Sequence, residues 1–353
     1  MGGLFGGRLK MARRKAMLSQ RELAKKVGVS AQAISKYERG LDMPSSGVLL
    51  RLAKALGVKV AYFFREVSVR SIVPAYRKRA RLRSKEKNAI VAEIRDWLER
   101  YLAIENLHSM EQQYPPLPEY NVSSWNAIEE VAIKLRNECS LGLAPIENLT
   151  ELLEDRGIKV GLIEGHEGFD GCTFLANGKI PVIVVRKGLP GDRQRFDLAH
   201  ELGHLVLEVA DNIDAEKAAY RFAGAFLVPE PVVYHELGEK RKSLNLYELH
   251  LLKHKYGLSM QGWIYRAKDL GIISKTVADY LFKRFRQKGW HRREPGDQIP
   301  PEKPKRMERL ILRALEEGLI SRVKASELLG KSISTFYREE AREHGGFPAG
   351  ICY

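Results

Sequence analysis

Three absences narrow the class of protein to which this sequence belongs. Its 353 residues include only three cysteines, and no two of them have Cys-x-x-Cys spacing. This argues against a disulfide scaffold or a cysteine-rich zinc site, and it favours a reducing cytoplasm. No run of eighteen apolar residues occurs, so we expect no membrane span. The basic residues 1–17 lack an apolar core, which argues against a signal peptide.

Positive charge is concentrated in the first hundred residues. The chain carries 59 Lys and Arg against 44 Asp and Glu, a formal net charge of +15. Residues 1–100 hold 24 of the basic and 8 of the acidic side chains, so the remainder is almost neutral. A basic block on a neutral chain is typical of a module that binds a polyanion. For residues 77–87, a solvated basic linker explains the charge equally well.

Residues 1–65 have the pattern of a helix-turn-helix domain. Ser19 and Glu22 form a capping box at the start of one helix, and Gly28 ends it. Ser30 can cap the next short helix, and an apolar third segment follows. Two short helices separated by Gly-Val-Ser, with a third packed against them, are the arrangement of this motif.

Residues 66–120 are expected to connect this domain to the next. Within residues 66–113, apolar side chains recur at helical spacing from Ile90 to Tyr101, which predicts a basic amphipathic helix. We interpret its stripe as a packing face between domains or protomers. The segment QYPPLPEY, residues 113–120, is rich in proline and predicts a linker.

The spacing of apolar residues changes from helical to strand-like, which predicts a domain of helices and strands over residues 121–290. After two helices, IKVGLI is expected to form a strand, and two more strands are expected on either side of the hairpin signal Asn177-Gly178. Pro181 lacks a ladder donor, which predicts that its strand lies at the edge of the sheet. Residues 291–353 are assigned to a linker and a C-terminal helical domain. In that domain two predicted helices are again separated by a short turn, here with the sequence LGKS.

The segment RFDLAHELGHLVLE contains the pattern His-Glu-x-x-His. His200 and His204 lie four apart on a predicted helix, so both ring nitrogens can reach one zinc ion. Glu201 can hydrogen-bond a metal-bound water and accept its proton as general base. The mostly apolar flanks allow the helix to be held rigidly inside a domain, and Gly203 allows another element to approach closely.

A third ligand is expected on the following helix. Asp214 is its predicted N-cap, Pro229 follows its end, and Glu216 lies in its first turn. Ala219 and Ala223 form a small face that can pack tightly on the motif helix. We therefore predict Glu216 as the third zinc ligand. The alternative is a surface carboxylate that stabilises the helix dipole.

Other histidine patterns are weaker. The near-twin HELGE at His235 lacks the second histidine and an apolar flank, so we interpret it as surface. His250 and His254 have ligand spacing, but an amphipathic helix with histidines on one face explains them better. Cys172 is placed near the site by the hairpin, where a buried inert thiol is the expected role.

Most of the chain resembles the ImmA/IrrE family of metallopeptidases, preceded by a Xre/Cro-type helix-turn-helix domain. The resemblance rests on RQRFDLAHELGH, on Glu-x-x-Ala-x-x-Phe-Ala followed by LVP, on YGLSMQGWIYRAKDLGIIS and on GWHRREP. It implies that His200, His204 and Glu216 bind zinc and that Glu201 is the general base. It also implies a zincin-like fold for residues 121–290. The protein as a whole is then expected to be mainly α-helical, with a helix-turn-helix bundle, an α+β domain with a small sheet, and a C-terminal helical unit.

The resemblance also implies roles for further residues, and the chain departs from the family at one position. Tyr220 stands where the family usually has a small polar residue; it could donate to the developing oxyanion, although a packing role fits equally well. In the helix-turn-helix domain, Gln32 can read adenine in the major groove, while Gln20, Lys36 and Arg39 can contact phosphates or bases. The remaining implied DNA contacts are Ser30 and Ser35. The alternative for this domain is a role in dimerisation alone.

Two functions remain open. In the first, a DNA-bound zinc endopeptidase cleaves a partner protein, such as a repressor, in a stress, phage or mobile-element response. In the second, a non-proteolytic transcriptional regulator or antitoxin uses its peptidase-like domain to sense or bind a repressor or toxin. An intact Glu201 favours the enzyme. For both we expect a double-stranded DNA operator, zinc, no membrane partner and, from two-fold operator symmetry, a homodimer.

Overall fold

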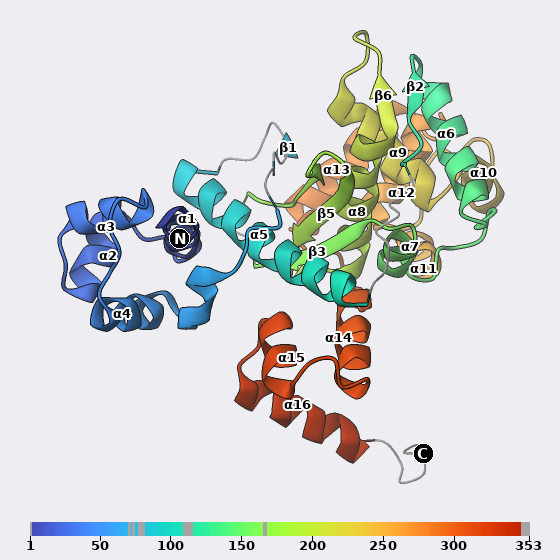
Figure 1. The fold of residues 1–353 in the computed structure, drawn as a ribbon. Helices are drawn as coiled ribbons and strands as arrows, with labels where there is room; N and C mark the ends of the chain where they lie inside the picture. The colour runs from blue at the N-terminus through green and yellow to red at the C-terminus, as the bar shows by residue number, and fades with distance from the viewer. Residues whose placement is uncertain are drawn as a thin grey trace. The chain divides into compact units, whose positions relative to one another are not determined.

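The computed structural model describes residues 2–69, 72, 75–76, 82–108, 116–164 and 168–346 (Figure 1). The chain divides into two compact units. The first takes the described residues up to Ile72, those from Leu82 to His108 and those from Lys305 on; the second takes the short strand at 75–76 and the described residues from 116 to Pro304. No helix among the described residues is long and apolar enough to cross a membrane.

The first unit begins with the predicted helix-turn-helix. The helices are α1 (Gly2–Lys15), α2 (Gln20–Val27), α3 (Ala31–Glu38) and α4 (Ser46–Leu56), followed by the 3₁₀ turn η1 (Val60–Phe64). The capping box of Ser19 and Glu22 is confirmed, and Gly28 ends α2 with a φ of 67°. Ser30 caps α3 by accepting from the Ala33 N–H at 3.0 Å. Apolar side chains of all these elements share one core.

Helix α1 extends further toward the N-terminus than the sequence pattern indicates. Its first turns contain four glycines, which are poor helix formers. The packing explains the helix, because a Cβ on Gly6 would lie only 2.5 Å from the Glu38 carbonyl oxygen. Glycine at this position lets α1 approach the end of α3 closely, and tertiary contact outweighs local propensity.

Helix α5 (Ser84–Leu107) joins the two ends of the first unit. Glu99 on α5 forms a buried ion pair with Arg8 of α1, and Lys15 Nζ lies 2.7 Å from Asp96 Oδ2. Arg100 donates to the Leu328 carbonyl at 2.6 Å. The predicted apolar stripe is buried, which confirms it as a packing face. The last helices of this unit are α14 (Arg306–Glu316), α15 (Arg322–Leu328) and α16 (Ile333–Gly346).

The expected helix over residues 66–113 is shorter than predicted. It begins at Ser84, and residues 75–76 form the short strand β1 instead. The sequence contains a proline at position 74, which is unfavourable inside a helix and argues against one that runs on from residue 66. Parts of the predicted basic linker (77–81) and of the proline-rich linker (113–115) lie outside the described residues.

The second unit contains a four-stranded sheet with the order β1-β4-β5-β3. The strands are β1 (Ala75–Tyr76), β3 (Lys159–Ile163), β4 (Gly171–Ala176) and β5 (Ile180–Arg186). β4 and β5 form the predicted hairpin, in which Asn177 and Gly178 both have positive φ, at 52° and 77°. β3 runs parallel to β5, and β1 runs antiparallel to β4.

The edge position predicted for the strand of Pro181 is wrong. β5 lies inside the sheet, between β4 and β3. Pro181 is tolerated because it stands at the beginning of the strand: it faces Leu175 of β4, and pairing with β3 starts only at the next residue, Val182. β4, and not β5, has a largely unpaired outer side. Within the described chain, only the two residues of β1 pair with it there.

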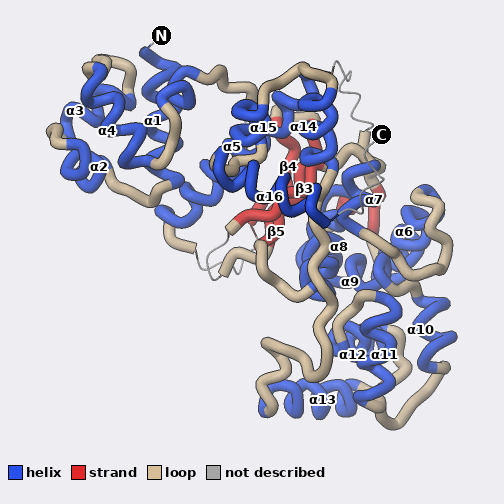
Figure 2. Tube along the Cα trace, turned by 90° about the horizontal axis from the view of Figure 1, so that it is seen from below, coloured by secondary structure: helices blue, strands red, loops and turns tan. Residues whose placement is uncertain are grey.

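Helices make up most of the second unit, as Figure 2 shows. They are α6 (Trp125–Glu138), α7 (Leu149–Asp155), α8 (Gly191–Val206), α9 (Ala215–Leu227), α10 (Glu230–Leu237), α11 (Leu246–Tyr256), α12 (Met260–Asp269) and α13 (Lys275–Gln287). A small parallel pair, β2 (Tyr120–Val122) and β6 (Leu207–Val209), completes it. α8 packs against β4 and β5 on one side and against α9 on another. The predicted mainly helical, α+β character is confirmed.

Candidate metal centre

Helix α8 carries the His-Glu-x-x-His motif through the middle of the second unit. Leu198, Ala199, Leu202 and Val206 of α8 belong to its apolar core. Even the polar His200 and Glu201 are almost fully buried. A helix enclosed in this way holds its side chains in fixed positions, which a metal site requires.

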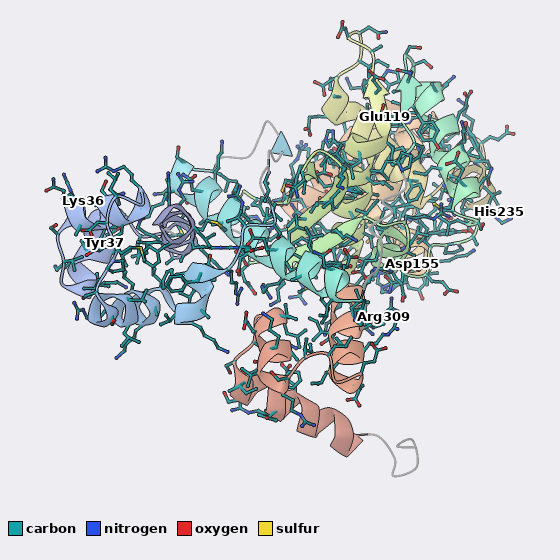
Figure 3. The ribbon with its side chains drawn as sticks, in the orientation of Figure 1. Lys36, Tyr37, Glu119, Asp155, His235 and Arg309 are labelled. Atoms are coloured by element: carbon teal, nitrogen blue, oxygen red, sulfur yellow. The ribbon has the colours of Figure 1, made fainter. Side chains whose placement is uncertain are left out.

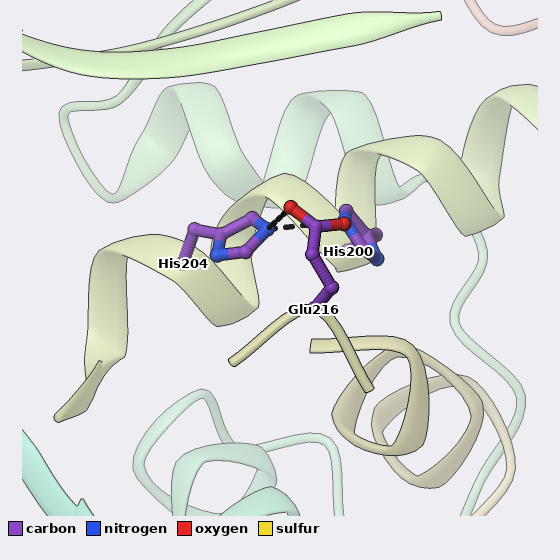
Figure 4. Close-up of side chains that lie close together, drawn as sticks. All are labelled: His200, His204 and Glu216. Atoms are coloured by element: carbon purple, nitrogen blue, oxygen red, sulfur yellow. Dashed lines mark hydrogen bonds and ion pairs between the residues drawn. The ribbon is translucent and has the colours of Figure 1, made fainter. Parts of the chain in front are cut away.

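His200, His204 and Glu216 converge on one point (Figure 4). The Nε2 atoms of the two histidines are 3.1 Å apart. Glu216 reaches across from the first turn of α9, with its carboxylate oxygens 3.6 Å from His200 Nε2 and 3.5 Å from His204 Nε2. Within the described residues, this is the group of three metal-type side chains whose ligand atoms come together.

The spacing of these atoms fits a zinc ion. Ligands at 2.0–2.1 Å from a tetrahedral centre are about 3.3–3.4 Å from one another. The three separations, 3.1, 3.5 and 3.6 Å, bracket that value. Two imidazoles and one carboxylate are also a ligand set that catalytic zinc uses. His200 is fully buried, whereas His204 and Glu216 are 22% and 26% exposed, so the centre is open to solvent on one side.

The close packing of α8 on α9 brings the three groups together. A Cβ on Gly203 would lie 3.0 Å from the Phe222 ring and 3.3 Å from the Ala219 Cα. This confirms that Gly203 permits close approach of another element and that Ala219 lies on the contacting face. Asp214 caps α9 by accepting from the Lys217 N–H at 3.0 Å, as predicted, which fixes the turn that presents Glu216.

Glu201 lies on the side of α8 that meets the sheet. A Cβ on Gly171, the first residue of β4, would be 3.0 Å from Glu201 Oε1. Gly171 is not among the predicted site residues, although a glycine inside a strand pattern is a signal of close approach. Burial and the negative charge of Glu201 raise the pKa of the Cys172 thiol well above its ordinary value. Cys172 is therefore a protonated, packed side chain.

Tyr220 covers the buried histidine. Its ring centroid lies 4.3 Å from that of His200, and it also stacks with Phe196 at a centroid distance of 6.0 Å. The side chain is 41% exposed and lies one turn along α9 from Glu216. It therefore forms part of the rim beside the metal ligands.

An extended segment from Glu294 to Glu302 binds the beginning of α8. This segment lies within the region expected to be a linker, yet the Gly191 N–H donates to the Ile299 carbonyl at 2.8 Å. Glu302 forms an ion pair with Arg195 and accepts from the N–H groups of Leu149 and Thr150 at the start of α7. Composition alone does not reveal this role, because the contacts are made by single residues far apart in the sequence.

The weaker histidine patterns do not join the site. His235 projects from α10 with an 82% exposed side chain (Figure 3), as expected of surface. The expectation that HELGE has no apolar flank is wrong, since Val233 and Leu237 of α10 are buried. His250 and His254 lie side by side on α11, with ring centroids 4.6 Å apart, and no carboxylate completes a cluster with them among the described residues.

The helix-turn-helix presents most of its predicted DNA contacts to solvent. Gln32 and Lys36 are exposed on α3, and Ser30 and Arg39 are exposed at its two ends. Lys36 is labelled in Figure 3, on α3, beside the buried Tyr37. Ser35 is half-buried.

Gln20 differs from the other predicted contacts. Its amide donates to Glu38 Oε2 at 2.8 Å, and Glu38 also receives Arg13. Gln20 is therefore held in place by a side chain of its own domain.

Two family models match parts of the chain. Residues 9–63 match a helix-turn-helix family, and residues 154–268 match the IrrE N-terminal-like domain. An uncharacterized transcriptional regulator in the ATPase CF(0) region of Rhodospirillum rubrum is 44% identical over 62 residues, 18% of this chain and 57% of that protein. The uncharacterized HTH-type transcriptional regulator y4wC of Sinorhizobium fredii is 36% identical over 61 residues, 17% of this chain and 43% of its own. The chain thus spans about half the length of these relatives.

Two solved structures align along most of the chain with low scores. PlcR of Bacillus thuringiensis, in complex with the peptide PapR7 and DNA, is 12% identical over 98% of this chain and 99% of its own, with a TM-score of 0.19. ComR of Streptococcus suis is 12% identical over 96% of each chain, with a TM-score of 0.17. Scores this low do not establish a shared fold.

Proposed function

We propose that this chain, which combines a helix-turn-helix domain with an IrrE N-terminal-like domain, is a cytoplasmic DNA-binding regulator whose second domain is a zinc-dependent endopeptidase. The convergence of His200, His204 and Glu216, with a buried Glu201 beside them, carries this proposal. Its substrate is a partner protein such as a repressor. The helix-turn-helix implies binding to double-stranded DNA, and the two-fold symmetry of operators favours a homodimer.

Each residue of the centre has a distinct role in the proposed reaction. His200, His204 and Glu216 would hold zinc, which when bound supplies an acidified water and polarises a peptide carbonyl. Glu201 accepts the proton of the attacking water and delivers it to the leaving amine. Gly171 leaves the room that the Glu201 carboxylate occupies against the start of β4.

The outer side of β4 is the proposed site of the substrate backbone. β4 begins at Gly171, next to Glu201, and beyond the two residues of β1 its outer side has no strand partner in the described chain. An extended peptide could pair with this strand by β-augmentation. The strand of Pro181 does not offer such a surface, because it lies inside the sheet.

Tyr220 is the proposed donor to the oxyanion that develops on the substrate. Its phenol ring already lies beside His200 at the rim of the centre. Replacement by phenylalanine keeps the ring and removes only the hydroxyl. We expect Tyr220→Phe to retain zinc while turnover falls, and an unchanged turnover would assign Tyr220 to packing alone.

The metal centre is tested by zinc content. We expect purified His204→Ala protein to lose zinc, because one of three ligands is removed. His254→Ala is a matched control, since it removes one histidine of another pair four apart on a helix that lacks a converging carboxylate. Zinc content unchanged by His204→Ala would show that the ion is bound elsewhere.

The peptidase activity is tested with Glu201→Gln. This variant should retain zinc and DNA binding but lose hydrolysis by about 10²–10⁴-fold. New protein N-termini that appear in cells expressing the wild-type chain, and are absent with Glu201→Gln, would identify the substrate. If Glu201→Gln gives the same N-termini and the same regulatory output, the protein is a non-proteolytic regulator or antitoxin.

A further inference from the structure

The C-terminal helices repeat the cap spacing of the helix-turn-helix. In the first motif, Ser19, Gly28 and Ser30 mark the start of α2, its end and the start of α3. Ser321, Gly330 and Ser332 stand at the equivalent positions of the last helices, each 302 residues further along the chain, although α15 ends one residue earlier than the offset from α2 requires, at Leu328. Both motifs therefore have the same spacing from the first serine to the glycine and from the glycine to the second serine. The second occurrence, at residues 321–332, lies outside both of the ranges that the family models match.

The backbone geometry repeats with the same offset. Gly28 and Gly330 have φ values of 67° and 69°, a left-handed conformation that favours glycine. After the glycine, the Val29 N–H donates to the Ala24 carbonyl at 3.1 Å, and the Lys331 N–H donates to the Ser326 carbonyl at 2.9 Å. A left-handed glycine followed by the same backbone hydrogen bond therefore ends the first helix of both motifs.

The helix caps also correspond. Ser30 Oγ accepts from the Ala33 N–H at 3.0 Å, and Ser332 Oγ accepts from the Thr335 N–H at 3.1 Å. The first helices begin in the same way, with Ser321 Oγ accepting from the Lys324 N–H at 3.3 Å, as Ser19 Oγ does from Glu22. Both N-cap serines and the left-handed glycine therefore correspond between the two motifs.

The burial pattern places equivalent faces toward the core and toward solvent. Ile34 of α3 is fully buried, and its equivalent, Phe336 of α16, is 5% exposed. Around Phe336, α14 and α5 supply the third side of a small core through Ile311, Ala314 and Ile104. α16 therefore packs as the second helix of a three-helix motif, with its opposite face in solvent.

The solvent face of α16 has donors suited to DNA. Ser334 and Arg338 are exposed at the positions equivalent to Gln32 and Lys36. The first turn of α16 contains no acidic residue. A hydroxyl can donate to or accept from base edges, and a guanidinium can bind guanine or phosphate. We propose that α15 and α16 form a second helix-turn-helix that binds double-stranded DNA, with α16 in the major groove.

The test uses the full chain and a pool of duplexes with a random 40-bp core. We expect wild-type protein to select two sequence elements. Gln32→Ala with Lys36→Ala should abolish selection of one element, and Ser334→Ala with Arg338→Ala should abolish the other and weaken binding to selected duplexes about tenfold. Because the two pairs report separate elements, failure of this inference is distinguishable from failure of DNA binding by the first motif.

Two further variants separate DNA contact from misfolding. Arg338→Lys keeps the charge but lacks the bidentate fork, so it should retain the salt dependence of binding and relax the selected sequence. Arg313→Ala removes an exposed charge from α14, away from the proposed contact face, and should leave both elements unchanged. If the Ser334/Arg338 pair selects the same sequences with wild-type affinity, α16 does not bind DNA and its exposed face serves a protein contact or none.

Discussion

At the scale of single residues, the proposed chemistry depends on how Glu201 is confined. The two histidines of the motif are the proposed metal ligands, whereas Gly171 leaves the room that Glu201 occupies against β4. A methyl group there would stand 3.0 Å from Glu201 Oε1 and 3.1 Å from the Val184 carbonyl oxygen. Since the backbone oxygen cannot yield, the carboxylate must move. Gly171 is thus a positioning residue for the proposed general base.

We expect Gly171→Ala to lower hydrolysis of an identified substrate by at least about tenfold, since misplacing a catalytic group by 1 Å can cost about 10²-fold. Zinc content should stay at the wild-type level, because the atoms nearest to the added methyl belong to Glu201 and Val184 and not to a proposed zinc ligand. The measurements are turnover and zinc stoichiometry on the same preparation.

Gly203→Ala is the matched comparison. Its added methyl would press on Ala219 and Phe222 and separate α8 from α9, the two helices that carry the proposed ligands. This variant should therefore lose zinc affinity together with activity. Loss of zinc in Gly171→Ala, or full activity with alanine at 171, would contradict the assigned role.

At the scale of elements, local signals were predictable and tertiary ones were not. The capping box at Ser19, the Ser30 cap and the Asn177-Gly178 hairpin depend on neighbouring residues, so the sequence alone indicates them. The convergence of His200, His204 and Glu216 was also predictable, from helical periodicity and a small-residue face.

Local sequence patterns do not predict the structure where contacts between distant parts of the chain determine it. The position of Pro181 within the sheet depends on where β3 begins to pair. The glycine-rich start of α1 is helical because Gly6 packs against the end of α3. The role of Glu302 depends on α7 and α8, whose contacting residues lie more than a hundred positions away. No local pattern contains this information.

Glu302 gives a prediction for the rigidity of the motif helix. Its side chain is 11% exposed and pairs with Arg195, which is 6% exposed. Glu302→Gln would leave the Arg195 guanidinium without its counter-charge, and losing one partner of a buried pair costs about 3–5 kcal/mol. We expect faster hydrogen exchange in the first turns of α8 and at the start of α7.

Asp297→Asn provides the control on the same extended segment, because that side chain is exposed. It removes one negative charge without touching α8. Equal exchange rates in α8 for Glu302→Gln, Asp297→Asn and wild type would show that the segment does not anchor the motif helix.

At the scale of the whole molecule, charge pairs on α5 connect α1 with the rest of the first unit. Burial alone would raise the pKa of Asp96, but the ammonium of Lys15 and the guanidinium of Arg100 outweigh it and lower that pKa below its ordinary value of 3.8. A carboxylate whose pKa is lower in the folded state stabilises that state at neutral pH. The stabilisation is lost as the pH falls below about 4 and through the lowered pKa.

We therefore expect Asp96→Asn to weaken the attachment of α1 by about 1–3 kcal/mol at pH 7. The difference from wild type should shrink as the pH falls below about 4, because Asp96 then becomes neutral in the wild-type protein as well. Hydrogen-exchange mass spectrometry of α1 peptides across a urea series, at pH 7 and at pH 2.5, measures both quantities. Asp42→Asn, an exposed change in the same unit, should have no effect at either pH. An Asp96→Asn defect of equal size at both pH values would mean that side-chain packing, and not the charge on Asp96, holds α1 to α5.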